Sequence, residues 1–153
     1  MHETEALYIR RLTAEDLEPL HRLLSDPAVM RYLEPPFTRA QTEAILQKAG
    51  MGREPLIRAV EDGRGFAGYV IYHPYDETSM ELGWVLASDR WGRGYALALT
   101  RQMICRAREN GRDAVIECHP QQAATRHIAE KLGFRPCGMD GGCCVYRLAG
   151  KNE

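Results

Sequence analysis

Residues 89–99 read DRWGRGYALAL and place Gly92 and Gly94 directly before an apolar helical run. Glycine is a poor helix former, costing about 1 kcal/mol per residue relative to alanine, so two glycines here need a reason. The first N–H groups of a helix have no intrahelical acceptor, and with the helix dipole they attract anions. The stretch therefore predicts either a phosphate-binding turn or a glycine-rich turn that only reverses the chain.

Two common nucleotide-binding motifs do not fit this turn. A Walker loop ends in Gly-Lys-Ser/Thr, which is absent, and the dinucleotide fingerprint requires a third glycine near position 97, where the chain has Leu97. Arg90 and Arg93 flank the glycines and either pair with phosphate or are simply solvated. An anion site at this turn would therefore be of another kind.

The composition is that of one soluble domain. The 153 residues are 44% hydrophobic, and 20 Lys and Arg nearly balance 21 Asp and Glu. This balance gives no electrostatic argument for nucleic acid as a partner. No apolar export signal opens the chain, and no stretch approaches the ~20 apolar residues of a membrane span. We expect a single cytoplasmic domain over residues 1–153, a monomer or homodimer without nucleic-acid or membrane partners.

The five cysteines are expected to be reduced thiols. Their number is odd and no export signal is present, so no disulfide framework is predicted. Cys105 and Cys118 lie in apolar runs typical of buried thiols. Cys143 and Cys144 are adjacent, so they point to opposite faces of a strand and do not easily share a metal ion. We therefore expect no metal site.

Hydrophobic periodicity divides the chain into alternating elements. Strands are expected at residues 6–12, 55–61, 65–74, 79–87, 113–120 and 141–149, and helices at 13–26, 38–50, 91–110 and 121–133. Two capping pairs and two glycines mark helix ends, namely Thr13 with Asp16, Thr38 with Gln41, Gly111 and Gly133. Segment 27–37 contains three prolines and is expected to be a loop. This order predicts an α/β (α+β) fold with a mixed central sheet and helices on its faces.

Two motifs in this order carry a family resemblance. Residues 81–100, ELGWVLASDRWGRGYALALT, are followed by HPQQAATRHIAEKLGFRP at residues 119–136. They resemble the acetyl-coenzyme A (acetyl-CoA) binding half of the Gcn5-related N-acetyltransferases, particularly the ribosomal-protein-alanine acetyltransferase-like branch. The resemblance runs from the first strand to EKLGF. It implies a mixed, strongly twisted sheet whose fourth and fifth strands separate to admit the pantetheine arm.

The resemblance also implies a set of coenzyme-binding residues. Backbone groups of Trp84, Val85 and Leu86 would pair with pantetheine like an added strand. Backbone amides of the turn would hold the pyrophosphate, namely those of Trp91, Gly92, Arg93, Gly94, Tyr95 and Ala96. Arg90 and Arg93 are the candidate side-chain partners of its phosphates. Gln122 and Thr125 stand where the family often has Asn and Ser, and they are the expected side-chain contacts to the coenzyme.

The implied reaction is direct attack of a primary amine on the thioester of acetyl-CoA. A base must take the proton of the amine, and the N–H of Val85 or Leu86 is a candidate oxyanion donor. Glu81 lies near where some relatives place a catalytic glutamate, and it is either this base or an exposed strand carboxylate. Many members of the family carry a tyrosine shortly before KLGF as the general acid that protonates the leaving thiolate. The segment RHIAEKLGF has none, so the thiolate would take its proton from Thr125, from water or in solution.

Other polar residues are weaker candidates for the site. His119 is a second candidate base, although a loop-supporting role is favoured, and His73 and His127 are expected to be structural or solvated. Tyr32 either contacts the acceptor or packs between the N-terminal helices. Five loop carboxylates either attract a cationic acceptor or are simply solvated: Glu3, Glu5, Glu34, Asp76 and Glu77.

Three hypotheses from different classes follow. The first is an acetyl-CoA-dependent N-acetyltransferase whose acceptor is a protein N-terminus or a small-molecule amine. The second is a non-catalytic acyl-CoA sensor, favoured by Gln122, Thr125 and the missing tyrosine. The third is an interaction domain whose glycine turn binds nothing. Release of coenzyme in the presence of an amine distinguishes the first from the second, and binding of CoA distinguishes both from the third.

Overall fold

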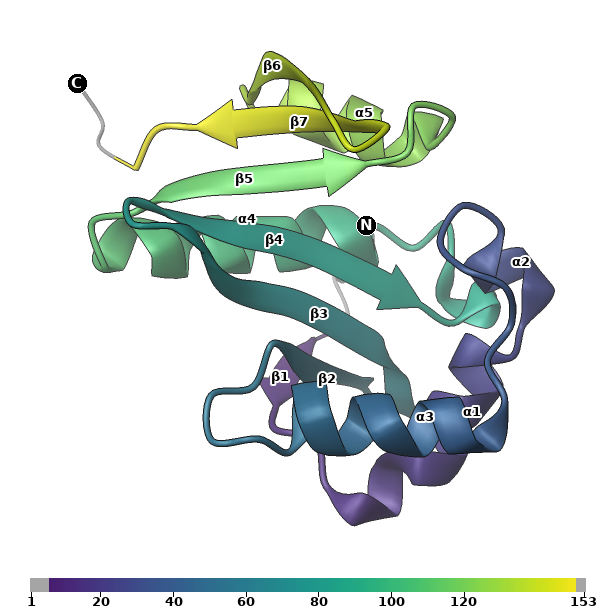
Figure 1. Ribbon diagram of the computed structural model, residues 1–153. Coiled ribbons are helices and arrows are strands. Elements are labelled where there is room, and N and C mark those ends of the chain that lie inside the picture. The colour runs from purple at the N-terminus through teal and green to yellow at the C-terminus, as the bar shows by residue number, and fades with distance from the viewer. Residues whose placement is uncertain (1–5, 151–153) are drawn as a thin grey trace. The chain divides into compact units, whose positions relative to one another are not determined.

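The computed structural model describes residues 6–150, and its helices and strands are drawn in Figure 1. The described residues form two compact units, each made of two chain segments. Unit 1 contains the residues up to Ile71 together with Trp84–Tyr95, and unit 2 contains Tyr72–Gly83 together with the residues from Ala96 onward. The chain passes between the units within two strands and at the start of a helix. The single domain expected from the sequence stays a prediction.

Seven strands are hydrogen-bonded in the order β1-β2-β3-β4-β5-β7-β6. Their bounds are β1 (Tyr8–Arg10), β2 (Ile57–Asp62), β3 (Gly65–Asp76), β4 (Ser79–Leu86), β5 (Asp113–Cys118), β6 (Arg135–Asp140) and β7 (Cys143–Leu148). β4 and β5 pair in parallel, whereas β1–β2, β2–β3, β5–β7 and β6–β7 pair antiparallel. The predicted α/β fold with a mixed sheet is therefore confirmed.

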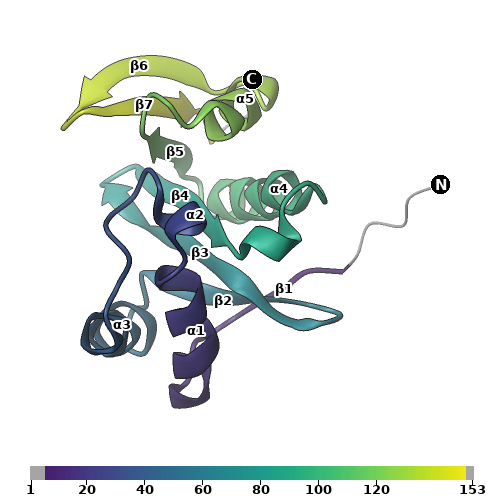
Figure 2. The same ribbon diagram turned by 90° about the vertical axis from the view of Figure 1, so that its right-hand side faces the viewer.

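Unit 1 packs its N-terminal helices over a leucine-rich core. These helices are α1 (Leu17–Leu24), α2 (Pro27–Met30) and α3 (Arg39–Ile45), and α3 continues into a wider turn at Leu46–Gly50. α1 and α3 lie side by side in Figures 1 and 2. Leucines three and four residues apart on α1 form one apolar face. The core includes Leu20, Leu23, Leu24, Leu46, Ile57, Ala59, Tyr69 and Val85.

Unit 2 contains most of α4 (Tyr95–Glu109), all of α5 (Ala123–Lys131) and strands β5, β6 and β7. α5 packs on β5, and β7 pairs with β5 on one side and with β6 on the other. Positions with helical spacing on α4 and alternating positions on the strands are buried, among them Leu99, Met103, Ala107, Ala114, Ile116 and Tyr146. These residues give unit 2 its own core.

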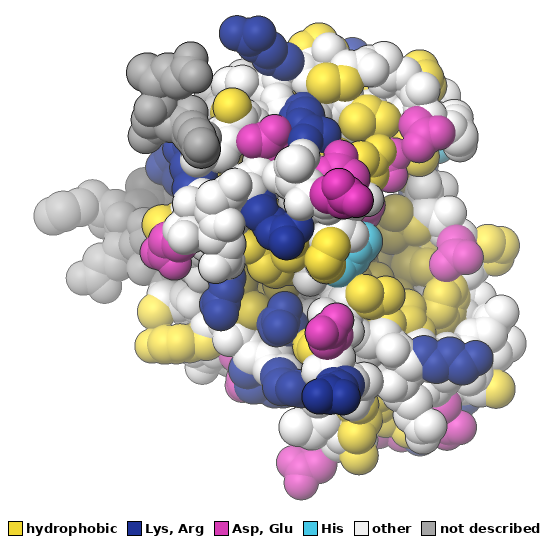
Figure 3. Space-filling model, turned by 60° about the vertical axis from the view of Figure 1, so that its left-hand side comes forward, with side chains coloured by type: hydrophobic (Ala, Val, Ile, Leu, Met, Phe, Trp, Pro, Cys, Tyr) yellow, Lys and Arg dark blue, Asp and Glu magenta, His cyan; other side chains and the backbone are white. Residues whose placement is uncertain are grey.

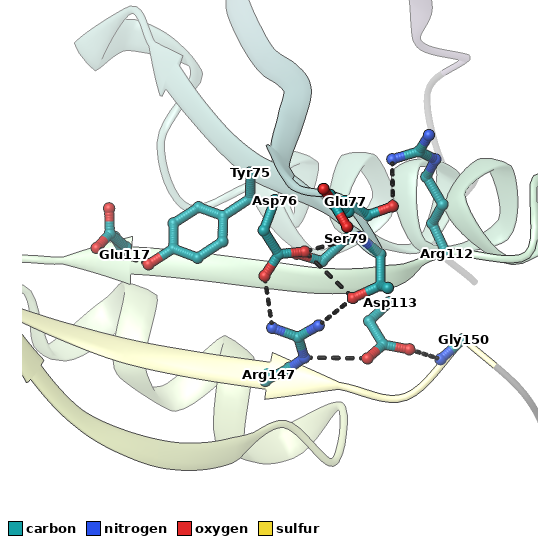
Figure 4. Close-up of polar contacts among 10 residues, drawn as sticks. Tyr75, Asp76, Glu77, Ser79, Arg112, Asp113, Glu117, Arg147 and Gly150 are labelled. Carbon is teal, nitrogen blue, oxygen red and sulfur yellow. Dashed lines mark hydrogen bonds and ion pairs between the residues drawn. The ribbon is translucent and has the colours of Figure 1, made fainter.

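An arginine on β7 fixes the turn that joins β3 to β4, as Figure 4 shows. The guanidinium of Arg147 donates to Asp76 Oδ2 at 3.2 Å and to Asp113 Oδ2 at 3.0 Å. Asp76 Oδ1 in turn accepts a hydrogen bond from Ser79 Oγ at 2.7 Å. These bonds hold the pKa of Asp76 well below its usual range, with the Ser79 hydrogen bond as the largest cause. The start of β4 is thereby fastened to β5 and β7.

The parallel ladder between β4 and β5 is short. It pairs Ser79 with Asp113 and ends where Glu81 lies opposite Val115. The separation of these two strands that the family resemblance implies stays a prediction. Glu81 is thus the last residue of β4 in register with β5.

The helix ends mostly agree with the sequence. Thr38 N–H donates to Gln41 Oε1 at 2.8 Å and Gln41 N–H donates to Thr38 Oγ1 at 3.2 Å, which confirms this capping box. Thr13 N–H donates to Asp16 Oδ2 at 2.8 Å, and the helix there begins as a 3-10 turn. Gly111 and Gly133 follow the last residues of α4 and α5 with φ of 69° and 88°, as helix-ending glycines do.

Three expectations about the elements were wrong. α4 begins at Tyr95 and not at Trp91, so the two glycines precede the helix. Segment 27–37, expected to be a loop, opens with α2, because Asp26 caps the N–H of Ala28 and Pro27 suits a first helical turn. Strand β6 was not predicted, because RPCGMD contains proline and glycine. Its pairing with β7 tolerates them through a register shift between Pro136 and Met139.

Charged side chains of both signs are spread over the molecular face in Figure 3, with hydrophobic side chains between them. This distribution agrees with a formal net charge of −1. Within residues 6–150 no helix is long and apolar enough to cross a membrane.

Replacing Gly68 with alanine tests how closely β3 approaches β4. Gly68 lies at an irregularity of the β2–β3 pairing, and an added Cβ would lie 2.1 Å from the carbonyl oxygen of Val85. Gly68→Ala should lower the free energy of unfolding by about 1–3 kcal/mol in thermal or urea unfolding, because backbone must move. Gly65→Ala is the control, because its φ is also positive but its Cβ meets nothing within 4 Å. Equal losses would contradict the close approach.

Candidate functional site

The glycine turn lies between the end of β4 and the start of α4. Gly92 and Gly94 have φ of 75° and 79°, and no non-glycine residue in the described chain has a positive φ. Arg93 between them therefore has a negative φ, so that the sign of φ alternates over these three residues. Such alternation turns successive N–H groups toward one concave side, which is the geometry of an anion-binding nest. The φ values of the turn are compatible with phosphate binding, which stays a prediction.

The turn is also open. A Cβ added at Gly92 or Gly94 would meet no atom within 4 Å, so neither glycine is needed for packing inside the protein. The N–H groups of residues 92–94 donate to no acceptor in the part of the chain that the structure describes. Exposed, unpaired N–H groups beside a helix N-terminus suit the oxygen atoms of a phosphate. The residues present therefore fit a pyrophosphate group.

Two exposed side chains border the turn. Trp91 donates its indole Nε1–H to the carbonyl of Leu86 at 3.0 Å, which ties the first residue of the turn to the last residue of β4. Arg93 is exposed and has no ion pair among the described residues. The guanidinium of Arg93 is thus free to meet an anion at the turn.

Arg90 differs from Arg93 in its surroundings. It is 8% exposed, and its Nε and Nη2 donate to Asp62 at 2.8 and 3.2 Å. Its Nη1 also lies 3.0 Å from both oxygens of Asp89. Because these two carboxylates engage the guanidinium, the geometry favours a structural role for Arg90 over the predicted contact with phosphate.

The main chain at the end of β4 is the part of this strand that is expected to contact the coenzyme. The side chains of Val85 and Leu86 are buried, and that of Trp84 is half-buried. Beyond Leu86, the N–H of Ala87 donates to the carbonyl of Ala67 on β3 at 2.9 Å, which fixes the end of the strand. This segment is the one expected to pair with pantetheine through its main chain.

Glu81 lies among polar groups of unit 2. It is half-buried, and its Oε2 is 3.9 Å from Nε2 of His73 on β3. Burial raises the pKa of Glu81, the neighbouring His73 opposes this rise, and the charge of Glu117 adds to it. A carboxyl group with a raised pKa in a partly buried setting is suited to accept a proton near neutral pH. Glu81 is thus half-buried where the alternative was an exposed strand carboxylate, and its role as the base stays a prediction.

His73 and Glu117 were not recognised from the sequence as partners of Glu81. His73 Nδ1 donates to the carbonyl of Pro74 at 3.0 Å, which leaves Nε2 for Glu81. Glu117 follows Val115, the residue opposite Glu81, by two positions. In a parallel pair such residues share one face of the sheet, so a correct β4–β5 register would have found Glu117. Figure 4 shows Tyr75 pointing toward Glu117, with its hydroxyl 3.4 Å from Oε1.

The start of α5 carries the remaining predicted residues. Gln122 precedes the helix and accepts the N–H of His119 with its Oε1 at 2.8 Å. His119 Nδ1 accepts the N–H of Gln121 at 3.1 Å, which supports the loop role favoured for this histidine. Thr125 is half-buried in the first turn of α5. The side-chain amide of Gln122 is thus partly used within its own loop, and its NH₂ group is left for a ligand.

Comparison with known proteins identifies the family. The model of the acetyltransferase (GNAT) domain matches residues 6–135. The chain belongs to this family. Among curated relatives, the uncharacterized N-acetyltransferase YnaD of Bacillus subtilis is 25% identical over 145 residues, covering 92% of this chain and 85% of YnaD.

Solved structures share the GNAT fold. An acetyltransferase (GNAT family) from Bacillus anthracis has a TM-score of 0.82 at 24% identity and covers 97% of each chain. A spermidine N-acetyltransferase from Vibrio cholerae, in complex with CoA and spermine, has a TM-score of 0.74 at 23% identity and covers 92% of each chain. The ribosomal-protein-S18-alanine N-acetyltransferase of Escherichia coli has a TM-score of 0.69 at 16% identity, covering 97% of this chain and 96% of that one. By family and fold, the chain is an N-acetyltransferase.

The cysteines of this GNAT chain are only partly as expected. Cys118 is buried, and burial raises its pKa to about 11. Cys105 is exposed, so its predicted burial was wrong, because its neighbours Met103 and Ile104 form the buried side of α4. Across the described range 6–150, no three His, Cys, Asp or Glu side chains gather in a way that would hold a metal ion.

The predicted acceptor residues are scattered over the GNAT chain. Tyr32 lies under the guanidinium of Arg31, 5.0 Å from the ring centroid. Glu34 and Glu77 are exposed, and Asp76 is engaged by Arg147. Glu3 and Glu5 lie outside the described residues. His21, which the sequence did not suggest, contacts the buried Thr42 through Nδ1 at 3.0 Å and joins α1 to α3.

Neighbours of Glu81 should move its pKa in opposite directions. Glu117→Gln removes a negative charge that disfavours the carboxylate, so the pKa of Glu81 should fall. His73→Ala removes a neighbour that favours the carboxylate, so the pKa of Glu81 should rise. NMR titration of the Glu81 side-chain carboxyl measures both, with Glu130→Gln on α5 as the control. Shifts of the same sign in the two variants would contradict this electrostatic arrangement.

Proposed function

We propose that this GNAT chain transfers the acetyl group of acetyl-CoA to a primary amine by direct attack on the thioester. The observation that carries the proposal is a half-buried carboxyl of raised pKa, Glu81, on the strand that leads into an open anion-binding turn. The turn suits the pyrophosphate of the coenzyme, and the carboxyl suits the proton of the amine. Acetyl transfer to an amine needs both.

In this proposal acetyl-CoA is held mainly by main-chain groups. The N–H groups from Gly92 to Ala96 bind the pyrophosphate, and Arg93 adds a charge-assisted contact. The N–H of Trp91, which the family resemblance included, already donates to the carbonyl of Ser88 at 3.3 Å. The backbone of Trp84, Val85 and Leu86 pairs with the pantetheine arm. The NH₂ group of Gln122 and the hydroxyl of Thr125 are the further coenzyme contacts that we propose.

The chemical step follows from these roles. Glu81, as a carboxylate, takes a proton from the ammonium form of the acceptor, directly or through a water, so that the neutral nitrogen can attack. The new N–C bond forms as the C–S bond breaks, and an N–H donor at Val85 or Leu86 stabilises the negative charge on the carbonyl oxygen. The thiolate then takes a proton from Thr125 or from water. No covalent enzyme intermediate is needed, and the cysteines take no part.

The acceptor is proposed only as a class. A protein N-terminus is supported by the resemblance to the ribosomal-protein-alanine acetyltransferase-like branch. A small-molecule amine is supported equally, because one fold relative is a spermidine N-acetyltransferase. Screening peptides with free N-termini, polyamines and amino acids for acetyl-CoA-dependent CoA release decides between them. Binding of CoA without release for any amine would favour a non-catalytic sensor.

Gly94→Val tests the phosphate-binding turn. The valine side chain would occupy the open side of the turn and strain a φ of 79°. The affinity for CoA should fall at least tenfold, or by about 1.4 kcal/mol, in isothermal titration. Gly111→Val is the matched control, because its φ of 69° and its open surroundings impose similar strain away from the turn. Unchanged affinity in a folded Gly94→Val protein would refute the turn as the coenzyme site.

Glu81→Gln tests the base. Glutamine keeps the shape and most hydrogen bonds but does not accept the proton, so kcat should fall about 10²–10⁴-fold while the affinity for CoA is unchanged. The acidic limb of the wild-type pH profile should disappear in the variant, whose rate should follow the neutral fraction of the amine. A near-normal rate and pH profile would mean that Glu81 is not the base, and that Glu117, His119 or a bound water takes the proton.

A further inference from the structure

Asp62 is the most completely engaged carboxylate of unit 1. It is the last residue of β2, and its side chain is fully buried. Four hydrogen bonds reach its two oxygens. Oδ1 accepts from Arg64 N at 2.8 Å and from Arg90 Nη2 at 3.2 Å, and Oδ2 accepts from Arg90 Nε and from the Tyr95 hydroxyl, both at 2.8 Å. Neither the sequence motifs nor the family resemblance singled out this residue.

These partners bracket the glycine turn. Arg90 is the last residue before Trp91–Gly94, and Tyr95 is the first residue after it and the first of α4. One carboxylate therefore holds the residues on both sides of a four-residue turn. The turn itself is exposed and has few contacts of its own, so its shape depends on where its two ends are fixed.

We propose that Asp62 is a positioning residue for coenzyme binding: it fixes Arg90 and Tyr95 so that the N–H groups of the turn already point together before the pyrophosphate arrives. The inference rests on the proposed function, because it assigns to Asp62 the shape of the proposed pyrophosphate site. Preorganisation of this kind raises affinity by removing the entropic cost of ordering the turn upon binding.

The charges around Asp62 support a fixed arrangement. The Arg90 guanidinium holds the pKa of Asp62 well below its usual range, and the Tyr95 hydroxyl and Arg64 N–H act in the same direction. Asp62 therefore stays a carboxylate at every pH where a GNAT reaction would be measured. The pairing also neutralises Arg90, so that Arg93 is the cation left to attract an anion at the turn.

The test must separate positioning from simple stabilisation. A buried carboxylate that loses its charge destabilises a protein wherever it lies. Asp16 provides a matched control in the same unit, because it is also buried and accepts two hydrogen bonds of 2.8 Å from Arg10 and one from Thr13 N–H. Its partners do not flank the glycine turn. Asp16→Asn therefore reports the effect of weakening a buried, hydrogen-bonded carboxylate away from the turn.

The experiment compares two acetyl donors in Asp62→Asn, Asp16→Asn and the wild type. Acetyl-CoA carries the pyrophosphate, whereas acetyl-pantetheine lacks the nucleotide and its phosphates. In Asp62→Asn the KM for acetyl-CoA should rise about tenfold or more, while the KM for acetyl-pantetheine and the kcat with either donor change less than about twofold. Asp16→Asn should leave the ratio of the two KM values unchanged.

The outcomes distinguish the two levels of the proposal. Equal changes for both donors, or no change in a folded Asp62→Asn protein, would overturn the positioning role alone. A wild type with no preference for acetyl-CoA over acetyl-pantetheine would instead overturn the turn as the pyrophosphate site. If Asp62→Asn does not fold, Tyr95→Phe decides, because it removes one of the four bonds and keeps the ring; a selective rise in KM for acetyl-CoA of about threefold is expected. No selective rise in Tyr95→Phe would then overturn the inference.

Discussion

The buried ion pair between Asp62 and Arg90 is the interaction on which the glycine turn depends. A buried ion pair is weak evidence for stability, because the loss of solvation offsets much of the Coulomb attraction. The ion pair instead fixes the orientation of its two side chains, because a guanidinium and a carboxylate meet in few geometries. With Tyr95 on the same carboxylate, the ends of the turn are fixed by a bond network, and the glycines supply the φ values that side chains rarely adopt.

The proton chemistry depends on a balance at Glu81. Burial alone would favour the neutral acid, which takes no proton. His73 on β3 partly restores the carboxylate, whereas Glu117 on β5 works against it. A base must be ionised often enough to act and basic enough to hold a proton. The two neighbours on the flanking strands thus act on the pKa of Glu81 in opposite directions, while burial raises it. The three side chains come from three different strands.

Local signals in the sequence predicted much of the fold and part of the site. Periodicity, capping pairs and turn glycines are encoded within a few residues, so the order of elements and the Gly92–Gly94 turn were found. Asp62 was missed because its side-chain partners, Arg90 and Tyr95, lie 28 and 33 positions away. No local pattern distinguishes a buried carboxylate from a solvated one. The same limit applies to β6, which holds Pro136 and Gly138 only because β7 pairs with it. The exposure of Cys105 and the burial of Arg90 were missed for a related reason, since burial depends on tertiary packing.

Main-chain recognition explains how this chain departs from the family pattern and keeps a plausible coenzyme site. The indole of Trp91 bonds to the strand end and leaves the backbone of the turn exposed. The backbone of Trp84, Val85 and Leu86 is likewise independent of side-chain identity. Side chains enter mainly where a shape or a charge must be fixed, as with Asp62 at the turn and His73 beside Glu81. A site of this kind constrains φ values and strand ends more than residue types.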